Sequence, residues 1–359
     1  MRQGGRAYLK ALSVLAGVIV SALLLSNVLF VWNVRGAGPL LTPRVSLHEF
    51  VRDLPGHMPW FIPFLLLSAA VIPLRAFQWQ TTLSKPVALR ERYHLVAIGA
   101  FTHNALPGKL GELIRSFLMS RTQRIPFLQA LGSVAVCKLL EFAVLMGLVA
   151  LSFVGPFGEK MAHFAGPLRI AVGACVLLVV AVVMLAHYSL PLSRWLGRKG
   201  RMPRARHLLG HVSEGLGTAR SFRGMAWALL FSIGPVLAPA LAYGMALRGI
   251  GVRGGLFAGT VVLGAIALGQ SLPGLPVGMG LYYFVTNWAA RSLGASPEDA
   301  LAFSMLTHLG TVLSQATLGA FSVRLRGIRV RDLRRGGKLA REAANHIAHE
   351  AVEPAHVPG

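Results

Sequence analysis

Charged residues are scarce in this chain, and acidic residues are the scarcest of all. Only 14% of the 359 residues are charged, 13 Asp and Glu stand against 36 Lys and Arg, and the formal net charge is +23. A soluble domain of this size needs polar side chains on every outer side, so this composition excludes one. The few acids show no metal-ligand spacing, so we expect no metal, no cofactor and no enzyme active site.

Cysteine is nearly absent as well. Cys137 and Cys175 both fall in apolar stretches, where a thiol behaves as a small buried hydrophobe. Two such residues provide neither a disulfide framework nor a zinc site.

Long apolar runs are what the chain has in abundance. Hydrophobic residues make up 54% of the sequence, and about 20 mostly apolar residues cross roughly 30 Å of hydrocarbon as a helix. The pattern predicts an all-α polytopic membrane protein, with Trp60 and Trp79 at the two interfaces of its second span. Residues 46–54 have apolar side chains at helical spacing and are expected to lie on the outer surface. We expect six full spans, at about 11–32, 60–80, 125–154, 167–187, 225–247 and 302–323.

Positive charge is unevenly distributed along the chain. Segments that we assign to the cytoplasm hold 26 Lys and Arg, and outer segments hold 7. Because such an excess sets orientation, we expect a bacterial cytoplasmic (inner) membrane protein with both termini in the cytoplasm. The Arg-rich tail has no interleaved aromatic residues, so nucleic acid is not an expected partner. The cytoplasmic segments are 1–10, 81–124, 188–224 and 324–359, and the outer ones are 33–59, 155–166, 248–253 and 291–302.

Two apolar stretches, 93–121 and 254–292, are each interrupted by the tripeptide Leu-Pro-Gly, at 106–108 and 272–274. Each arm of the first has about 13 residues, which span roughly 20 Å and reach only the middle of the bilayer. We therefore predict two re-entrant helical hairpins, an inner one entered from the cytoplasm and an outer one entered from outside, in an inverted-topology repeat. The alternative is two unrelated kinks in ordinary spans.

The inner break is the first candidate for a working site. Pro107 and Gly108 interrupt the helix, and the half-helix that follows begins near mid-membrane, where its free amides and dipole favour an anion. Lys109 adds a full positive charge there. Glu112 and Arg115 follow at intervals of three residues, so neighbours in this trio are expected to pair along one side of the helix.

Several polar residues elsewhere in the sequence are candidates for supporting roles. His103 and Asn104 are expected to bond backbone groups that the break frees. Lys138 and Glu141, spaced i, i+3 in an apolar run, are expected to face the interior as a pair that is either structural or in contact with substrate. Arg75 is expected to extend to the lipid headgroups.

The outer break is less polar. Pro273, Gly278 and Gly280 shape it, without the preceding strand and glycine-rich loop of a nucleotide site. Tyr282 and Tyr283 either line a lipid-facing cleft or lie at the outer interface. The sequence leaves both alternatives open.

Together these motifs resemble the flippase-like membrane family that includes the transmembrane region of lysylphosphatidylglycerol synthases and hopanoid-associated membrane proteins. The likeness covers roughly residues 5–325, and it implies translocation of a lipid or related handling of polyprenyl or hopanoid lipids. It rests on Asn104-x-Leu-Pro-Gly-x-x-Gly-Glu-x-x-Arg115, on the charged residues 138 and 141, and on Pro-x-Gly-x-Gly at 276–280.

The chain departs from the family pattern at two places. Where the family usually has Glu-Arg and then Asp three residues after the Arg, this chain has Cys137, Lys138 and Glu141. Tyr283 stands where the family often has Glu in the late motif. The resemblance implies that this acid recognises a cationic headgroup, so its absence argues against lysyl-phosphatidylglycerol as the substrate.

We expect an ATP-independent lipid flippase or transporter, with the headgroup crossing a polar cleft while the acyl chains stay in the bilayer. The expected partners are membrane lipids with an anionic headgroup. The sequence does not decide whether the protein forms a homo-oligomer. The alternatives are an integral membrane transferase acting on a polyprenyl-phosphate lipid and a non-catalytic membrane scaffold. Residues 1–325 are expected to form a single transmembrane domain, and 326–359 a basic, flexible cytoplasmic tail. The substrate-binding candidates are Asn104, Pro107, Gly108, Lys109, Glu112, Arg115, Lys138, Glu141, Pro273, Gly278, Gly280 and Tyr283.

Overall fold

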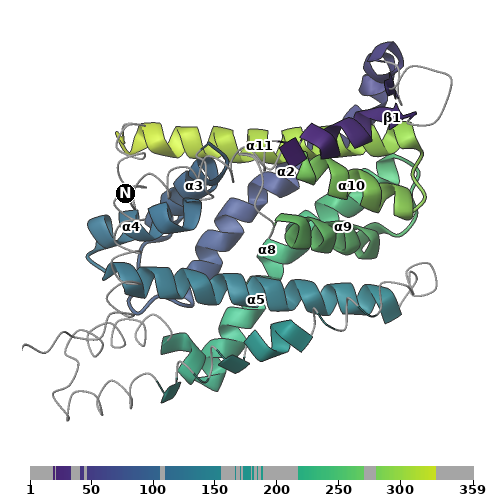
Figure 1. Ribbon diagram of the computed structural model, residues 1–359. Coiled ribbons are helices and arrows are strands. Elements are labelled where there is room, and N and C mark those ends of the chain that lie inside the picture. Colours follow the sequence, from purple (N-terminus) through teal and green to yellow (C-terminus); the bar gives the residue numbers. More distant parts are fainter. Residues whose placement is uncertain are drawn as a thin grey trace, which may run out of the picture. The chain divides into compact units, whose positions relative to one another are not determined.

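The described part of the computed structural model is almost entirely helical (Figure 1). The structure describes residues 19–20, 22–33, 41–43, 47–105, 110–154, 166, 170, 173–178, 180–181, 184, 187–188, 217–270 and 280–328. The elements are β1 (Phe30–Trp32), β2 (Leu41–Pro43), α2 (Leu47–Gln80), α3 (Leu89–Ala105), α4 (Gly111–Gln123), α5 (Phe127–Val154), the 3-10 turn η2 (Gly217–Arg220), α8 (Phe222–Gly249), α9 (Gly255–Gln270), α10 (Leu281–Ser292) and α11 (Pro297–Leu325).

The chain divides into two compact units, each assembled from separate stretches of sequence. Helices α2, α5, α8 and α11 contribute residues to both units, whereas α3 and α4 belong to unit 2 and α9 and α10 belong to unit 1. Unit 1 comprises residues 1–69, 148–162 and 238–314, and unit 2 comprises 70–147, 163–237 and 315–359.

Three of the described helices are long and apolar enough to cross a membrane: Val51–Gln80, Phe127–Ser152 and Phe222–Gly249. They coincide with three of the predicted spans. Helix α11 coincides with the predicted span at 302–323 but is not among these three. Most of the predicted span at 167–187 lies outside the described residues. The chain is therefore a multi-pass helical membrane protein.

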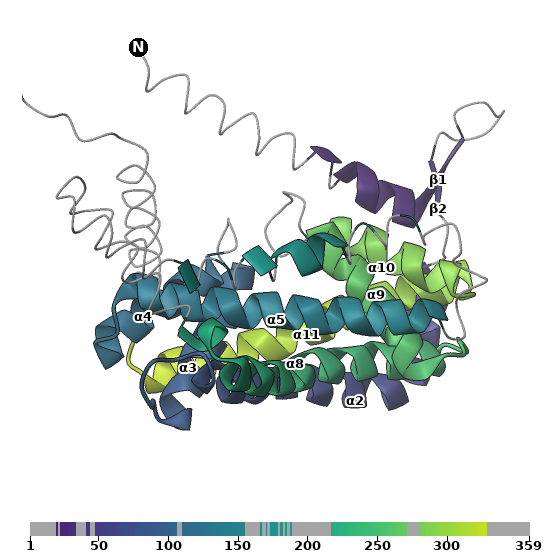
Figure 2. The ribbon, with the colours of Figure 1, turned by 90° about the horizontal axis from the view of Figure 1, so that it is seen from below.

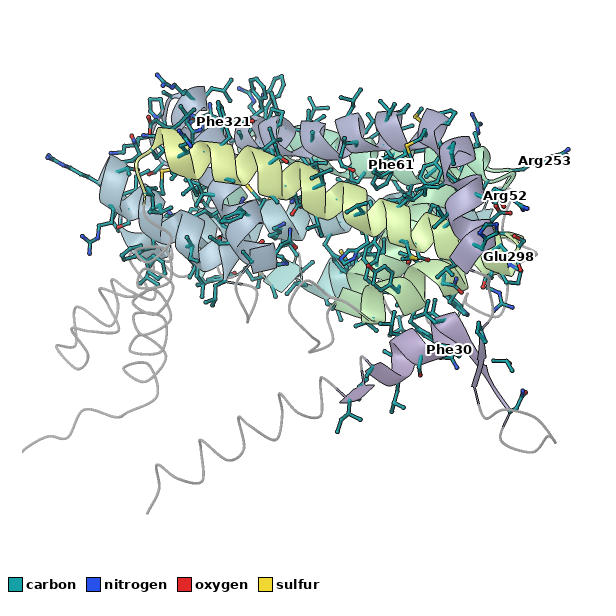
Figure 3. All side chains as sticks on the ribbon, turned by 90° about the horizontal axis from the view of Figure 1, so that it is seen from above. Phe30, Arg52, Phe61, Arg253, Glu298 and Phe321 are labelled. Carbon is teal, nitrogen blue, oxygen red and sulfur yellow. The ribbon has the colours of Figure 1, made fainter. Side chains whose placement is uncertain are left out.

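Large apolar side chains lie on the outside of both units. On α8, Phe222 is 89% exposed and Trp227 is 60% exposed, as expected of side chains that contact lipid rather than water. Charged side chains are placed differently: Arg52, Arg253 and Glu298 lie at one end of unit 1 (Figure 3).

In unit 2, helices α3 and α4 pack against each other at the site of the predicted inner hairpin (Figure 1). They cross where two glycines meet, since a Cβ on Gly111 would collide with the Gly99 carbonyl. Residues 106–109, including Pro107, Gly108 and Lys109, lie outside the described residues. The prediction of two short helices on either side of this break is confirmed.

In unit 1, helices α9 and α10 form the equivalent pair and lie side by side in both ribbon views (Figures 1 and 2). Gly280 directly precedes α10 and has a φ of 85°, in the left-handed region that favours glycine. Pro273 and Gly278 fall in residues 271–279, outside the described part. Gly280 thus has a backbone role.

Two details of the predicted elements are wrong. Phe30, Val31 and Trp32 were expected to end the first span, but they form strand β1, which pairs antiparallel with β2; aromatic and β-branched residues favour such pairing. Residues 46–54 do not form a separate surface helix, because α2 starts at Leu47 and continues through Pro55. A proline removes one helical hydrogen bond but leaves its neighbours, so a long apolar helix continues through it.

Candidate functional site

Four helices of unit 2 bring six titratable side chains together, and we refer to these six as the charged cluster. Helix α2 supplies one, α3 one, and α4 and α5 two each. An apolar core that includes Trp79, Leu95, Met119 and Val134 packs the same four helices against one another. The charged cluster consists of Arg75, His103, Glu112, Arg115, Lys138 and Glu141.

Arg75 and Glu141 form the most fully paired contact of the charged cluster. Arg75 Nε and Nη2 donate to the two carboxylate oxygens of Glu141, at 3.2 and 2.9 Å. The prediction that Arg75 extends to the headgroups is therefore wrong. A planar guanidinium matches a carboxylate at two points, and a partly buried carboxylate favours such a partner over water.

Lys138 links the two acids of the charged cluster. Its ammonium nitrogen lies 3.4 Å from Glu141 Oε2, one helical turn away, and 3.6 Å from Glu112 Oε1 on α4. The pairing predicted from the i, i+3 spacing is present. The contact with Glu112 joins α5 to α4, which the spacing along α5 did not reveal.

Among the described residues, His103 and Asn104 contact other side chains, and the backbone of the break at 106–109 lies outside that part of the chain. His103 Nδ1 lies 3.4 Å from Glu112 Oε2, and Asn104 Nδ2 donates to Gln315 Oε1 of α11 at 2.7 Å. Asn104 also donates to its own helix, to the Ala100 carbonyl at 3.4 Å. Glu112 thus has a different partner at each oxygen, His103 and Lys138, and within the described residues it forms no ion pair with Arg115, its predicted partner.

Arg115 is the least satisfied member of the charged cluster. It is only 6% exposed, and its Nε is buried without a hydrogen-bond partner. Its guanidinium carbon lies 5.1 Å from the centre of the Trp79 ring, within the range of a cation–π interaction. The Trp79 indole donates to Ser133 at 3.0 Å, which fixes the ring. Trp79 lies at the end of a membrane-length helix, as predicted, but its side chain is buried in the protein and does not face the headgroups.

The charged cluster has more positive than negative charge. Arg75, Arg115 and Lys138 carry three positive charges, and Glu112 and Glu141 carry two negative ones, so the sum is +1 with His103 neutral. Lys109 adds another positive charge in the segment 106–109, between α3 and α4, which lies outside the described residues. Within the described ranges, no group of three or more His, Cys, Asp and Glu side chains is arranged to hold a metal ion. The arrangement is suited to attracting an anion.

A second polar group lies in unit 1, and we call it the tyrosine–histidine cluster: Tyr243, Tyr282, Tyr283, Thr307 and His308. The Tyr282 hydroxyl is 2.9 Å from that of Tyr243 and donates to Thr307 Oγ1 at 3.2 Å. The Tyr283 hydroxyl is 2.9 Å from His308 Nδ1. Tyr282 is buried, so neither alternative predicted for it, lipid-facing cleft or outer interface, is correct.

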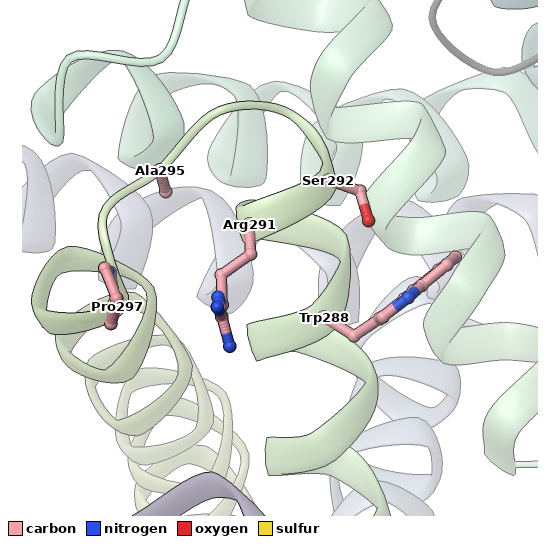
Figure 4. Close-up of a pocket in the computed structure, with 5 residues that line it drawn as sticks. All are labelled: Trp288, Arg291, Ser292, Ala295 and Pro297. Carbon is pink, nitrogen blue, oxygen red and sulfur yellow. The ribbon is translucent and has the colours of Figure 1, made fainter. Parts of the chain in front are cut away.

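Unit 1 also has a shallow pocket of about 370 Å³ at the turn between α10 and α11. No sequence pattern predicts this pocket, because its lining is an ordinary helix end. Figure 4 shows Arg291 between Trp288 on α10 and Pro297 at the start of α11. Ser292 and Ala295 complete the lining.

The sequence did not assign two residues to the site: Arg75, which pairs with Glu141, and Trp79, whose ring lies against Arg115. Arg75 is the one cation within the otherwise uncharged stretch 60–80, and that signal was available. Trp79 gave no such signal, since a tryptophan at the end of a span is ordinary at an interface.

Comparison with known proteins identifies one family. A family model described as the lysylphosphatidylglycerol synthase TM region matches residues 14–319. Neither the curated proteins nor the solved structures contain a match to this chain.

Proposed function

The chain belongs to the lysylphosphatidylglycerol synthase TM region family, and we propose that it moves an amphipathic lipid with an anionic headgroup between membrane leaflets without ATP. Membership in this family makes a role connected with membrane lipids the general expectation. The finer proposal, translocation, draws on the charged cluster. The headgroup would pass through a polar cleft while the acyl chains remain in the bilayer.

Arg115 is the single observation that carries the proposal. A buried N–H without a partner costs free energy, and a charge within a membrane protein is expensive unless it is paired or functional. Arg115 combines both costs in a cluster whose summed charge is already positive. A headgroup phosphate would satisfy the donor and balance the charge.

The members of the charged cluster then take distinct roles. Arg115 and Lys138, with Lys109 on the neighbouring segment, attract the phosphate. Glu112 neutralises Lys138 when no headgroup is bound, since Glu112 and Lys138 are 3.6 Å apart. Arg75 and Glu141 satisfy each other and hold α2 against α5. Asn104 orients the end of α3 through Gln315.

We extend the proposal to the topology of the chain. Six full spans, two re-entrant hairpins and both termini in the cytoplasm of a bacterial inner membrane would place the two breaks at mid-membrane. Element order supports an inverted repeat, because α2, α3, α4 and α5 follow the same long–short–short–long pattern as α8, α9, α10 and α11. Residues 1–325 would form the transmembrane domain.

A transferase is the second candidate, since the family's description contains the word synthase. In that case Glu112 would act as a general base on a polyprenyl-phosphate substrate. Turnover of such a lipid by the purified protein, lost in Glu112→Gln, would favour the transferase over the flippase.

Reconstitution into vesicles tests the proposed function. Vesicles with and without the protein contain fluorescent phosphatidylglycerol in both leaflets, and a membrane-impermeant reductant measures how fast the inner pool becomes accessible. We expect faster exposure with the protein, and a reduction of roughly 10- to 100-fold in Arg115→Gln, which loses a charged donor. Arg121→Gln is the matched control, because Arg121 lies on the same helix but outside the charged cluster, over Phe117.

The outcome that contradicts the proposal is equally defined. Equal accessibility with and without protein, for anionic, zwitterionic and cationic fluorescent lipids alike, would exclude translocation. Equal loss in Arg115→Gln and Arg121→Gln would remove Arg115 from the binding role.

A further inference from the structure

We propose that the charged cluster binds a proton together with the headgroup, and that the His103–Glu112 pair holds this proton. The inference rests on the proposed function and adds the ion that is coupled to lipid movement. It is carried by the way in which Glu112 is shared between two partners on different helices.

Glu112 divides its two carboxylate oxygens between His103 and Lys138. Oε2 lies 3.4 Å from His103 Nδ1, and Oε1 lies 3.6 Å from Lys138 Nζ. The side chains of His103 and Glu112 are 32% and 35% exposed, whereas that of Glu141 is 11% exposed. Both side chains of the His103–Glu112 pair are thus about a third exposed, whereas in the Arg75–Glu141 pair the carboxylate is enclosed and only Arg75, at 28%, is comparably exposed.

The surroundings of His103 contain both signs of charge. From α4 it meets Glu112, with Arg115 one turn further along; from α5 the nearest cation is Lys138, which is joined through Glu141 to Arg75 of α2. From α11, the neutral Gln315 accepts a hydrogen bond from the neighbouring Asn104. An imidazole is the one ordinary side chain whose charge changes between about pH 5 and 8. His103 is therefore the member of the charged cluster that is suited to carrying a transferable proton.

Protonation of His103 changes what Lys138 is free to do. With neutral His103, the Lys138 ammonium is held by both carboxylates of the charged cluster. A proton from water on the imidazole gives Glu112 a full cationic partner, which weakens its attraction for Lys138. The summed charge rises from +1 to +2, so an incoming phosphate meets a stronger field. In this step the imidazole gains an N–H bond while an O–H bond of a hydronium ion breaks, and a water molecule is released.

Coupling of this kind is reciprocal. If a proton strengthens binding of the anionic headgroup, the headgroup strengthens binding of the proton by the same factor. Headgroup and proton would then cross together, and a proton gradient would drive net movement of the lipid in the direction of proton flow. ATP is not needed for such a cycle.

Transport measured across a range of pH tests the inference. With fluorescent phosphatidylglycerol and equal pH on both sides, we expect the wild-type rate to fall about five- to tenfold between roughly pH 5.5 and pH 8. His103→Gln should transport with a rate that no longer depends on pH in this range. His103→Arg should also lose the pH dependence but at a higher rate than His103→Gln, because its charge is fixed. A merely structural histidine would not separate these two variants.

His94→Gln is the matched control. His94 lies on the same helix, but its Nδ1 pairs with the Ser322 hydroxyl, 3.1 Å away, and it lies outside the charged cluster. The control should keep the wild-type pH dependence. A pH-independent wild-type rate, or the same pH dependence in His103→Gln, overturns the proton inference while leaving translocation intact.

A binding measurement separates the two proposals further. Calorimetric titration of the detergent-solubilised protein with short-chain phosphatidylglycerol, in two buffers of different ionisation enthalpy, counts the protons taken up on binding. We expect a fraction of a proton near pH 6.5 for the wild type and none for His103→Gln. Zero uptake by the wild type contradicts the inference even if no transport is detected.

Discussion

The guanidinium of Arg75 faces the carboxylate of Glu141 with two hydrogen bonds, although 66 residues separate them in the chain. Arg75 is 28% exposed and Glu141 11%, so the pair is largely removed from water. Two charges in such a position are stable only while both are present.

Breaking this pair on one side should destabilise the protein. Arg75→Met leaves the Glu141 carboxylate without its main partner, and we expect a loss of roughly 3 kcal/mol in the free energy of unfolding. Replacing both, as Arg75→Met with Glu141→Leu, should recover part of that loss, since the Glu141 charge is removed and Lys138 keeps Glu112 as a partner. Thermal unfolding in detergent measures both. If the double variant is less stable than the single one, the contact of Glu141 with Lys138 contributes more to stability than its contact with Arg75.

Arg115→Lys separates the charge of Arg115 from its shape. Lysine keeps the positive charge but lacks the planar group that stacks on Trp79 at 5.1 Å. Because a guanidinium binds phosphate at two points and an ammonium at one, we expect transport of phosphatidylglycerol to fall about three- to tenfold. The rate should lie between those of the wild type and Arg115→Gln. A lysine variant as fast as the wild type would mean that charge alone suffices.

Gly111→Ala should separate α3 from α4. The added Cβ would collide with the Gly99 carbonyl and crowd the Cβ of His103, and we expect a cost of about 1–3 kcal/mol from this overpacking. Gly147→Ala on α5 is the control, because its Cβ would meet no atom within 4 Å and alanine favours a helix. Stability of both is read from thermal unfolding. Equal stability of the two variants would contradict the close approach of α3 and α4.

Tyr282→Phe should weaken the tyrosine–histidine cluster. Its hydroxyl contacts Tyr243 and Thr307 at 2.9 and 3.2 Å, so its removal leaves two buried groups short of a partner. We expect a loss of about 1–2 kcal/mol in the free energy of unfolding. Tyr283→Phe removes a hydroxyl that is less enclosed, bonded to His308, and should cost less. The reverse order would show that His308 depends on Tyr283 more than the burial of the two hydroxyls indicates.

The helices could be predicted from the sequence because the signals for them are local. An apolar run of sufficient length predicts a span wherever it occurs, and three such helices are found. The Pro-Gly breaks likewise separated α3 from α4 and α9 from α10, since proline and glycine act within a few residues of their own position. Strand β1 was not predicted, because it depends on a signal that is not local: Phe30 pairs with Pro43 on a partner strand.

Only some of the contacts in the charged cluster could be predicted from the sequence. Lys138 and Glu141 are neighbours on one helix, so their contact follows from spacing alone. The contacts of Arg75 with Glu141 and of Asn104 with Gln315, 211 residues away, depend on how each helix is rotated about its axis. Composition does not specify that rotation. Arg75 was assigned to the headgroups because its own span contains no residue of opposite charge.

The aromatic ring beneath Arg115 has a consequence for the proposed binding site when no lipid is bound. A carboxylate in the place of Trp79 would neutralise the Arg115 guanidinium and accept hydrogen bonds from its N–H groups. The face of the Trp79 ring also offsets the positive charge, but it accepts no hydrogen bond in the plane of the guanidinium. Arg115 therefore keeps its charge, and its Nε–H remains available to an anion. An acidic residue introduced at position 79 should act as a permanent internal competitor of the lipid.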